Sequence, residues 1–327
     1  MTANVVTIDT VVLPEEDGKR TARESFPQLV ARLSHQSVVK HFDAYADIAW
    51  DTEEFRIDPD DPRWEQGVDE ELRASAWYQA QPAGVRSRLG LHLVASFMKI
   101  GLQFEGVLKQ GLLLFAADLP NRSPEFRYAY HEIIEESQHT LMFQEFVNRS
   151  GLDSPGLTWD LKLGSRAVVQ MARRFPEMFF VFVLGGEDPI DHVQRKVLRS
   201  GREIHPLLER IMRIHVTEEA RHLSFARHYL RETVPALGRR QRAAISVQAP
   251  FTLALMAGVM MRPPRQLVRT YSIPEAVLAE AYRPDGPAAQ EVRDSLRKVR
   301  ELLDDLGLIT PVSLRLWRRF GIWDQTG

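Results

Sequence analysis

The sequence predicts an all-α protein: a ferritin-like four-helix bundle with additional flanking helices. Long segments carry apolar residues at intervals of three or four, and the period-two pattern of strands is nearly absent. Four of these segments are long and are joined by bulky connections. Two of the four carry a Glu-x-x-His motif, and such motifs supply metal ligands in bundles of this kind.

The first elements are expected in the following order. Residues 1–22 form a flexible N-terminal arm, and residues 23–327 form a single helical domain. A helix covers about Phe26 to Asp47, and the Asp-Pro steps of the WDTEEFRIDPDDPRW segment then stop helices and mark a long surface loop. The next helix runs from Val85 to Ala117, where apolar residues follow the helical spacing.

The other bundle helices follow. Ser at the cap and Pro in the first turn favour a helix start at Ser123-Pro124, and this helix reaches about Asn148. A third helical region spans roughly Leu163 to Arg199, with interruptions at Pro176 and Pro189. A fourth spans Ile204 to Thr233. Two more helices are expected at 238–260 and 286–305, and the metal-binding bundle covers about residues 85–235.

The amino-acid composition argues against several classes of site and partner. The chain has 327 residues and no cysteine, which excludes disulfides, iron–sulfur clusters, thiolate zinc sites and cysteine nucleophiles. A formal net charge of -2 gives no electrostatic reason to expect a nucleic-acid partner. Any bound metal must be held by His, Asp and Glu, a hard ligand set that suits iron or manganese.

Neither a membrane segment nor a signal peptide is expected. The first residues lack a basic flank followed by an apolar run. The longest apolar stretch, Ala244 to Met261, contains Ser246, Gln248 and Pro250, so a buried helix is the better interpretation. The cytoplasm is the default compartment.

Two short motifs on different predicted helices carry the chemistry. They are Glu136-Ser-Gln-His139 and Glu219-Ala-Arg-His222. A spacing of three places Glu and His one turn apart on the same helix face, so both side chains can reach one metal ion. About one such match arises by chance in a chain of this composition. Two matches, each central in a long helix, predict the ligand set of a carboxylate-bridged di-iron bundle.

Such a bundle needs a further Glu from each of its other two helices. Glu105 lies in the apolar run GLQFEGVLKQGLLLF, and because a buried carboxylate without a partner is costly, burial favours a nearby cation. The alternative is an ion pair with Lys109. Glu187 follows the apolar run PEMFFVFVLGG. The residues alone favour a different interpretation there, in which the two glycines end one helix and the following Asp-Pro caps the next.

A third histidine shares a helix face with the second motif. His215 lies four residues before Glu219, so His215, Glu219 and His222 form one stripe over two helical turns. The alternative is a core histidine bonded to a neighbour. The stripe favours ligation, which gives three His and four Glu in place of the usual two-His set.

Three more residues are candidates for contacts behind the ligands. Asp191 lies four residues after Glu187 on the same face and is placed to accept a proton from a ligand His. Glu135 and Arg221 adjoin ligands and are candidates for pairing across helices. Ordinary inter-helix ion pairs are an equally good interpretation of these two residues.

Several runs of the sequence resemble the p-aminobenzoate N-oxygenase family of di-iron proteins. They are KHFDAYADIAWD, FEGVL, EIIEESQHTLMF, GEDPIDHVQRK and RIHVTEEARHLSFAR, in the family's order over roughly residues 28–235. The C-terminal part resembles the family only loosely. The resemblance restores Glu187 as a ligand and implies seven metal ligands: Glu105, Glu136, His139, Glu187, His215, Glu219 and His222.

The resemblance also implies an activity. Such a protein holds two iron ions (Fe2+/Fe3+) and uses O2 to oxidise an aryl or related amine towards hydroxylamine, nitroso or nitro products. The hard ligand set itself also allows manganese as a substitute. Electrons come from an external ferredoxin or reductase, because the sequence has no flavin or nicotinamide motif. A homodimer is expected. The amine pocket is expected to be lined from the helices that carry Phe97, Phe104, Phe179 and Phe182, and these four residues are equally good core residues.

Two other functions remain open. The first is a di-iron hydroxylase or desaturase that acts on carbon, and analysis of its products would distinguish it from an N-oxygenase. The other is a non-catalytic, iron-handling ferritin-like protein, which the asymmetric 327-residue chain disfavours. A purely structural interpretation of every Glu and His predicts a protein that purifies without metal.

Overall fold

The computed structural model describes residues 24–66 and 70–323, and over these residues it contains helices and no strand. The arm predicted at residues 1–22 lies outside the described residues. The α-helices are α1 (Phe26–Val39), α2 (Glu70–Ala74), α3 (Ala76–Gln79), α4 (Ala83–Ala117), α5 (Pro124–Ser150), α6 (Trp159–Arg174), α7 (Pro176–Arg199), α8 (Pro206–Thr233), α9 (Arg239–Met260), α10 (Arg265–Thr270), α11 (Glu275–Ala281), α12 (Pro287–Ser295), α13 (Arg297–Asp305) and α14 (Pro311–Arg319). Short 3₁₀ turns are η1 (Glu53–Phe55), η2 (Pro62–Gln66) and η3 (Val234–Ala236).

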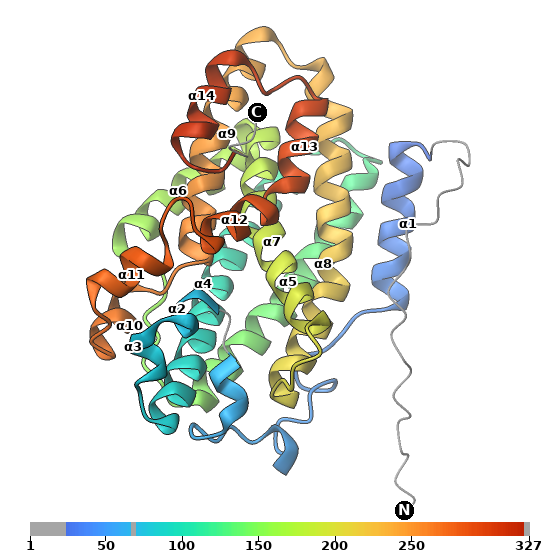
Figure 1. The fold of residues 1–327 in the computed structure, drawn as a ribbon. Coiled ribbons are helices and arrows are strands. Elements are labelled where there is room, and N and C mark those ends of the chain that lie inside the picture. Colours follow the sequence, from blue (N-terminus) through green and yellow to red (C-terminus); the bar gives the residue numbers. More distant parts are fainter. Residues whose placement is uncertain (1–23, 67–69, 324–327) are drawn as a thin grey trace, which may run out of the picture.

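Four long helices, α4, α5, α7 and α8, form the centre of the molecule (Figure 1). Helix α4 packs along α5, and α7 packs along α8. Helices α6 and α9 pack on the outside of α4 and α7, and α1 lies at one edge against α5 and α8 (Figure 1). The predicted all-α class, with a four-helix bundle and flanking helices, is therefore confirmed.

The first half of α7 anchors the bundle. Every residue from Glu177 to Pro189 is buried. Phe180 contacts the rings of Phe115, Phe225 and Tyr229, with centroid distances of 5.3, 5.6 and 4.6 Å. Burying one such side chain stabilises the fold by about 1.5–3 kcal/mol, so this cluster fixes α7 against α4 and α8. The residues that follow on α7 are thereby held in a defined position.

The predicted interruption of the third helical region at Pro189 is wrong, because α7 continues to Arg199. An interior proline costs a helix roughly 3 kcal/mol. The burial of the surrounding turns outweighs this cost, since helix stability in proteins comes mainly from tertiary packing. The break at Pro176 is confirmed: α6 ends at Arg174, and Pro176 begins α7.

Two other predicted helices differ in length. Helix α1 ends at Val39 and not at Asp47, because Asp43 Oδ1 accepts backbone hydrogen bonds from Tyr45 and Ala46 at 2.9 Å and favours a turn. The helix predicted at 286–305 is two helices, α12 and α13, separated at Leu296. Helix α14 was not predicted from the sequence; the side chain of its Thr310 cap accepts a hydrogen bond from Ser313 N at 3.2 Å.

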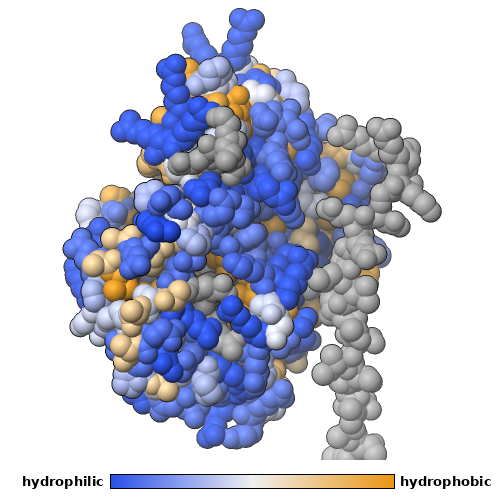
Figure 2. All heavy atoms as spheres, in the orientation of Figure 1, coloured by the Kyte–Doolittle hydropathy of each residue, from blue (hydrophilic) through white to orange (hydrophobic). Residues whose placement is uncertain are grey.

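Two helical stretches are long and apolar enough to cross a membrane by length and composition alone, at Ala83–Ala117 and Arg239–Thr270. In the most apolar window of each, 67% and 44% of the residues are buried inside the protein. Core helices of soluble proteins pass the same test, and the surface in view in Figure 2 is mainly hydrophilic. The fold is consistent with a soluble protein, and the absence of a membrane partner stays a prediction.

Candidate metal centre

Seven buried side chains from the four central helices meet inside the bundle. None of them is more than 3% exposed. Helix α4 provides Glu105, α5 provides Glu136 and His139, α7 provides Glu187, and α8 provides His215, Glu219 and His222.

The two Glu-x-x-His motifs face each other across α5 and α8. His222 Nδ1 lies 3.0 Å from Glu136 Oε1 and 3.1 Å from Glu219 Oε1. His139 Nδ1 lies 3.6 Å from Glu136 Oε2 and 3.5 Å from Glu219 Oε1. One nitrogen of each imidazole therefore points at the same pair of carboxylates, which is the arrangement expected from the helical spacing of three.

The remaining candidates complete the cluster. His215 Nε2 lies 3.9 Å from Glu105 Oε1 and 3.8 Å from Glu219 Oε1. Three overlapping groups have ligand atoms within 4.8 Å of one another. They are Glu105, His139 and His215; Glu136, His139 and Glu219; and Glu187, His215 and Glu219. The structure therefore brings all seven predicted residues together, with His222 joined through its contacts to Glu136 and Glu219.

Each histidine is held from behind through its other ring nitrogen. His139 Nε2 is hydrogen-bonded to Glu218 Oε2 at 2.8 Å, and His222 Nε2 to Glu135 Oε2 at 2.7 Å. His215 Nδ1 is bonded to Gln194 Oε1 at 3.0 Å. These outer oxygens can accept a hydrogen bond from the outer ring nitrogen, so that each inner nitrogen, once deprotonated, would offer its lone pair to a bound metal ion.

Several inner atoms have no hydrogen-bond partner among the described residues. They are Glu105 Oε1, both carboxylate oxygens of Glu136, Glu219 Oε2 and His139 Nδ1. Leaving a buried acceptor unsatisfied costs about 1–3 kcal/mol, and more for a charged group. Unpartnered oxygen and nitrogen atoms that converge on one point fit a pair of hard cations, so these residues are suited to hold two metal ions.

The pKa values indicate the same need for positive charge. Burial, and then the charge of Glu136, raises the pKa of Glu105 to about 8. Burial and the neighbouring carboxylates Glu219, Glu136 and Glu105 raise the pKa of Glu187 well above its usual range. Burial also acts on Glu136, but contacts with His139 and His222 outweigh it and lower its pKa. Without cations the cluster holds protons, and bound metal ions would displace them.

The residues predicted behind the ligands have different outcomes. The predicted pairing of Glu135 with Arg221 across helices is present, because Arg221 Nη2 donates to Glu135 Oε1 at 2.8 Å. Asp191 does not contact a candidate ligand histidine. Its carboxylate accepts from Arg195 Nε at 2.7 and 2.8 Å, and Arg195 Nη2 in turn donates to the Val216 carbonyl. The short i,i+4 pair satisfies Asp191 within its own helix.

Two of the outer partners, Glu218 and Gln194, were missed by the sequence analysis. A signal for Glu218 exists, because both motifs extend to Glu-Glu-x-x-His, at Glu135-Glu136 and at Glu218-Glu219. The first Glu of each pair bonds the histidine of the other motif. Gln194 lies seven residues after Glu187, two helical turns along α7, but an isolated Gln carries no comparable pattern.

A cavity of about 600 Å³ reaches the cluster at Glu105, Glu187 and His215. This volume lies within the range of small-molecule sites. Both helices expected to line a pocket do so: Phe97 and Phe104 of α4 and Gly186 and Glu187 of α7 line the cavity. Phe179 and Phe182 do not line it and belong to the buried core.

Sequence comparisons with known proteins identify a family and relatives of the chain. A family described as P-aminobenzoate N-oxygenase AurF matches residues 23–307. The uncharacterised proteins Mb0909 of Mycobacterium bovis and Rv0885 of Mycobacterium tuberculosis are each 41% identical to the chain over 293 residues, which cover 90% of this chain and 86% of theirs. No solved structure gave a significant match.

Proposed function

The chain belongs to the p-aminobenzoate N-oxygenase family, and from this premise we propose that it is a non-haem di-iron oxygenase that oxidises the nitrogen of an aryl or related amine. The observation that carries the proposal is the cluster of seven buried Glu and His side chains, several of whose inner atoms lack a hydrogen-bond partner among the described residues. Family membership supports the coarser assignment of an oxygenase with a di-iron centre.

Two iron ions in the cluster would supply the redox chemistry with dioxygen. Four carboxylates and three imidazoles would hold them, and the bundle around them excludes water from all but the cavity side. Glu218 and Glu135 are placed to accept the outer N–H hydrogen bonds of His139 and His222, so the inner nitrogens could offer their lone pairs to bound metal ions. No observation favours manganese over iron.

The reaction requires an electron donor. Oxidation of an amine to a hydroxylamine inserts one oxygen atom into an N–H bond, and reduction of the second oxygen atom to water consumes two electrons and two protons. We assign the electrons to an external ferredoxin or reductase, because the chain has no flavin or nicotinamide motif. The cytoplasmic location, the single domain and the homodimer stay predictions.

The test combines metal analysis with one turnover. Protein loaded with ferrous iron should hold about two irons per chain, as expected for a four-carboxylate site. After anaerobic reduction, exposure to ¹⁸O2 in the presence of 4-methylaniline should give a hydroxylamine in which the oxygen bonded to nitrogen is ¹⁸O. Products labelled on the ring or methyl carbon would instead indicate a carbon hydroxylase, and ferrous oxidation without organic product an iron-handling protein.

Two histidines of α8 provide a matched pair of variants. His215→Ala removes a candidate ligand, and we expect it to lose iron and the labelled product together. His228→Ala is the control, because His228 contacts the Ser224 carbonyl of its own helix and lies outside the cluster. Full iron content and turnover in His215→Ala would contradict the three-histidine site.

A further inference from the structure

The cavity connects the metal cluster with the surface along one face of α7. Gly186 and Glu187 line its buried end, and Ile190, Val193 and Val197 follow at intervals of three or four. Ser200 lines its exposed end. With a rise of 1.5 Å per residue, the path from Glu187 to Ser200 is about 20 Å long. This is several times the length of a single aromatic ring.

Apart from Gln194, which is hydrogen-bonded to His215, the walls beside the cluster are mainly apolar. Phe97, Gly101 and Phe104 of α4 line this part, together with Phe143 of α5. Phe143 lies against His215 with a ring-centroid distance of 5.2 Å. Gly101 adds no side chain, and a Cβ there would stand 3.4 Å from the Phe143 ring, so the glycine keeps the passage wide at this point.

The charges that line the cavity are distributed unevenly. Among the described lining residues the cationic side chains are Arg63, Lys196 and Arg202. Lys196 and Arg202 are exposed and Arg63 is half-buried. Each of these cations already has a partner. Lys196 Nζ donates a hydrogen bond to Glu291 Oε2 at 2.8 Å, and Arg63 Nε donates one to Asp61. Arg202 also interacts with another group of the protein. Lys196 lies nine residues, or about 14 Å, along α7 from Glu187.

The carboxylate of a small acid would therefore be unpaired in this site. If the amino group of 4-aminobenzoate approached the cluster, its carboxylate would fall short of Lys196, which lies about 14 Å along α7 from Glu187. Arg63 already binds Asp61, and Arg202 lies beyond the end of α7 and has an interaction of its own. A buried, unpaired carboxylate is strongly unfavourable. An apolar group in the same place would gain free energy from leaving water.

We propose that the cavity selects an elongated arylamine whose ring carries an uncharged, apolar tail. The amino group faces Glu105, Glu187 and His215, and the tail lies along the Ile190–Val197 face of α7 towards Ser200. This inference rests on the proposed function for the choice of an amine, but the shape and polarity of the cavity define the tail.

The test is a binding series of 4-alkylanilines, which are uncharged at neutral pH. Equilibrium dialysis uses the iron-loaded protein in its oxidised form with no reductant, so that no turnover occurs. Each methylene that leaves water adds up to about fourfold in affinity, so 4-butylaniline should bind roughly 10- to 60-fold more tightly than 4-methylaniline. 4-Octylaniline should bind more tightly still, and 4-aminobenzoate at least about tenfold more weakly than 4-methylaniline.

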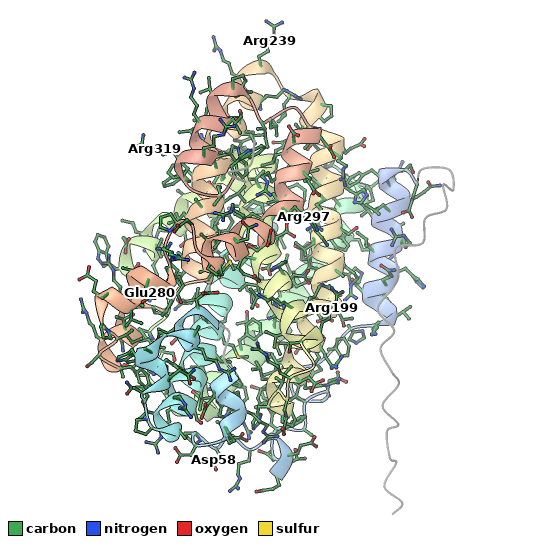
Figure 3. The ribbon with its side chains drawn as sticks, in the orientation of Figure 1. Asp58, Arg199, Arg239, Glu280, Arg297 and Arg319 are labelled. Atoms are coloured by element: carbon green, nitrogen blue, oxygen red, sulfur yellow. The ribbon has the colours of Figure 1, made fainter. Side chains whose placement is uncertain are left out.

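Tryptophan substitutions locate the tail. Val193 and Val197 lie about 9 and 15 Å from Glu187 along α7. Val193→Trp should abolish the gain in affinity from 4-butylaniline to 4-octylaniline and reduce the gain from 4-methylaniline to 4-butylaniline. Val197→Trp, nearer the exposed end, should reduce only the longer gain. Arg199→Trp is the control, because Arg199 is exposed at the end of α7 and does not line the cavity (Figure 3).

The results separate this inference from the proposed function. Affinity that does not rise with chain length, tight binding of 4-aminobenzoate, or a chain-length gain that both valine variants retain would overturn the apolar tail. Circular dichroism and iron content identify a variant that fails to fold, and the other valine variant then decides. Binding as predicted without nitrogen oxidation would refute the N-oxygenase and leave the cavity assignment standing. Oxidation of the nitrogen of short anilines, without a gain in affinity with chain length, would support the N-oxygenase and refute the apolar tail.

Discussion

Glu105→Gln separates the function of a buried carboxylate from its cost to stability. Glu105 is 1% exposed, and its Oε2 accepts a hydrogen bond from Thr140 Oγ1 at 2.7 Å, while Oε1 has no hydrogen-bond partner. Burial, and then the charge of Glu136, raises its pKa from 4.5 to about 8. Glutamine has almost the same shape, keeps an acceptor for Thr140 and carries no charge.

The magnitude follows from the pKa difference. In the unfolded chain Glu105 ionises with a pKa near 4.5, whereas the metal-free folded protein favours the protonated form up to about pH 8. Because the folded pKa is raised, stability from this group is fully present below pH 4.5 and is lost as the pH rises towards 8. At 1.36 kcal/mol per unit, the loss is about 3 kcal/mol at pH 7 and under about 1 kcal/mol at pH 5. Glu105→Gln should raise the free energy of unfolding by these amounts at the two pH values.

The assay is thermal unfolding in EDTA at both pH values. For a domain of this size, about 3 kcal/mol corresponds to a rise in Tm of roughly 5 °C at pH 7, and little change is expected at pH 5. With ferrous iron the order should reverse, because only the wild type gains the full stabilisation from bound metal. Glu280→Gln, on the exposed surface of α11, should change neither Tm (Figure 3). A lower Tm of Glu105→Gln at pH 7 in EDTA, or an equal rise at both pH values, would refute the reasoning.

Three further predictions concern the site and its frame. Competition with a chelator should show iron affinity falling by about tenfold or more from pH 8 to pH 6, since buried carboxylates with raised pKa values bind protons in place of metal; a flat profile would contradict this. Glu218→Gln weakens the support of His139 and should lower iron affinity by roughly 10- to 100-fold, whereas exposed Glu232→Gln on the same helix should not. A Cβ at Gly186 would lie 2.2 Å from a phenylalanine ring, so Gly186→Ala should lower the free energy of unfolding by about 1–3 kcal/mol. Gly258→Ala should instead raise the free energy of unfolding measured by chemical denaturation, since Gly258 is helical, exposed and free of close neighbours.

Helical periodicity and ligand spacing predicted much of this fold and its candidate site. The spacing of three in both motifs is a local property of helices, so the convergence of Glu136, His139, Glu219 and His222 required only that two helices face each other. Glu187 could not be assigned from its residues alone. Its position depends on α7 running through Pro189, and that depends on packing contributed by other helices.

The contacts behind the ligands were harder to predict for the same reason. Asp191 is well placed on a helical wheel, yet Arg195 one turn later satisfies it. Glu218 and Gln194 reach histidines 79 and 21 residues away in the chain, so their partners depend on how the helices rotate about their axes. Spacing within one helix does not determine this rotation.

Gln194 differs from the other outer partners in two ways. Glu135 and Glu218 are carboxylates and, when ionised, can only accept a hydrogen bond from a histidine, whereas the amide of Gln194 can accept or donate one. Gln194 also lines the cavity, where a guest molecule would touch it. A guest that turned the amide over would move the proton of His215 from Nδ1 to Nε2 and withdraw its lone pair from the metal. The availability of His215 as a ligand would thereby depend on what occupies the cavity.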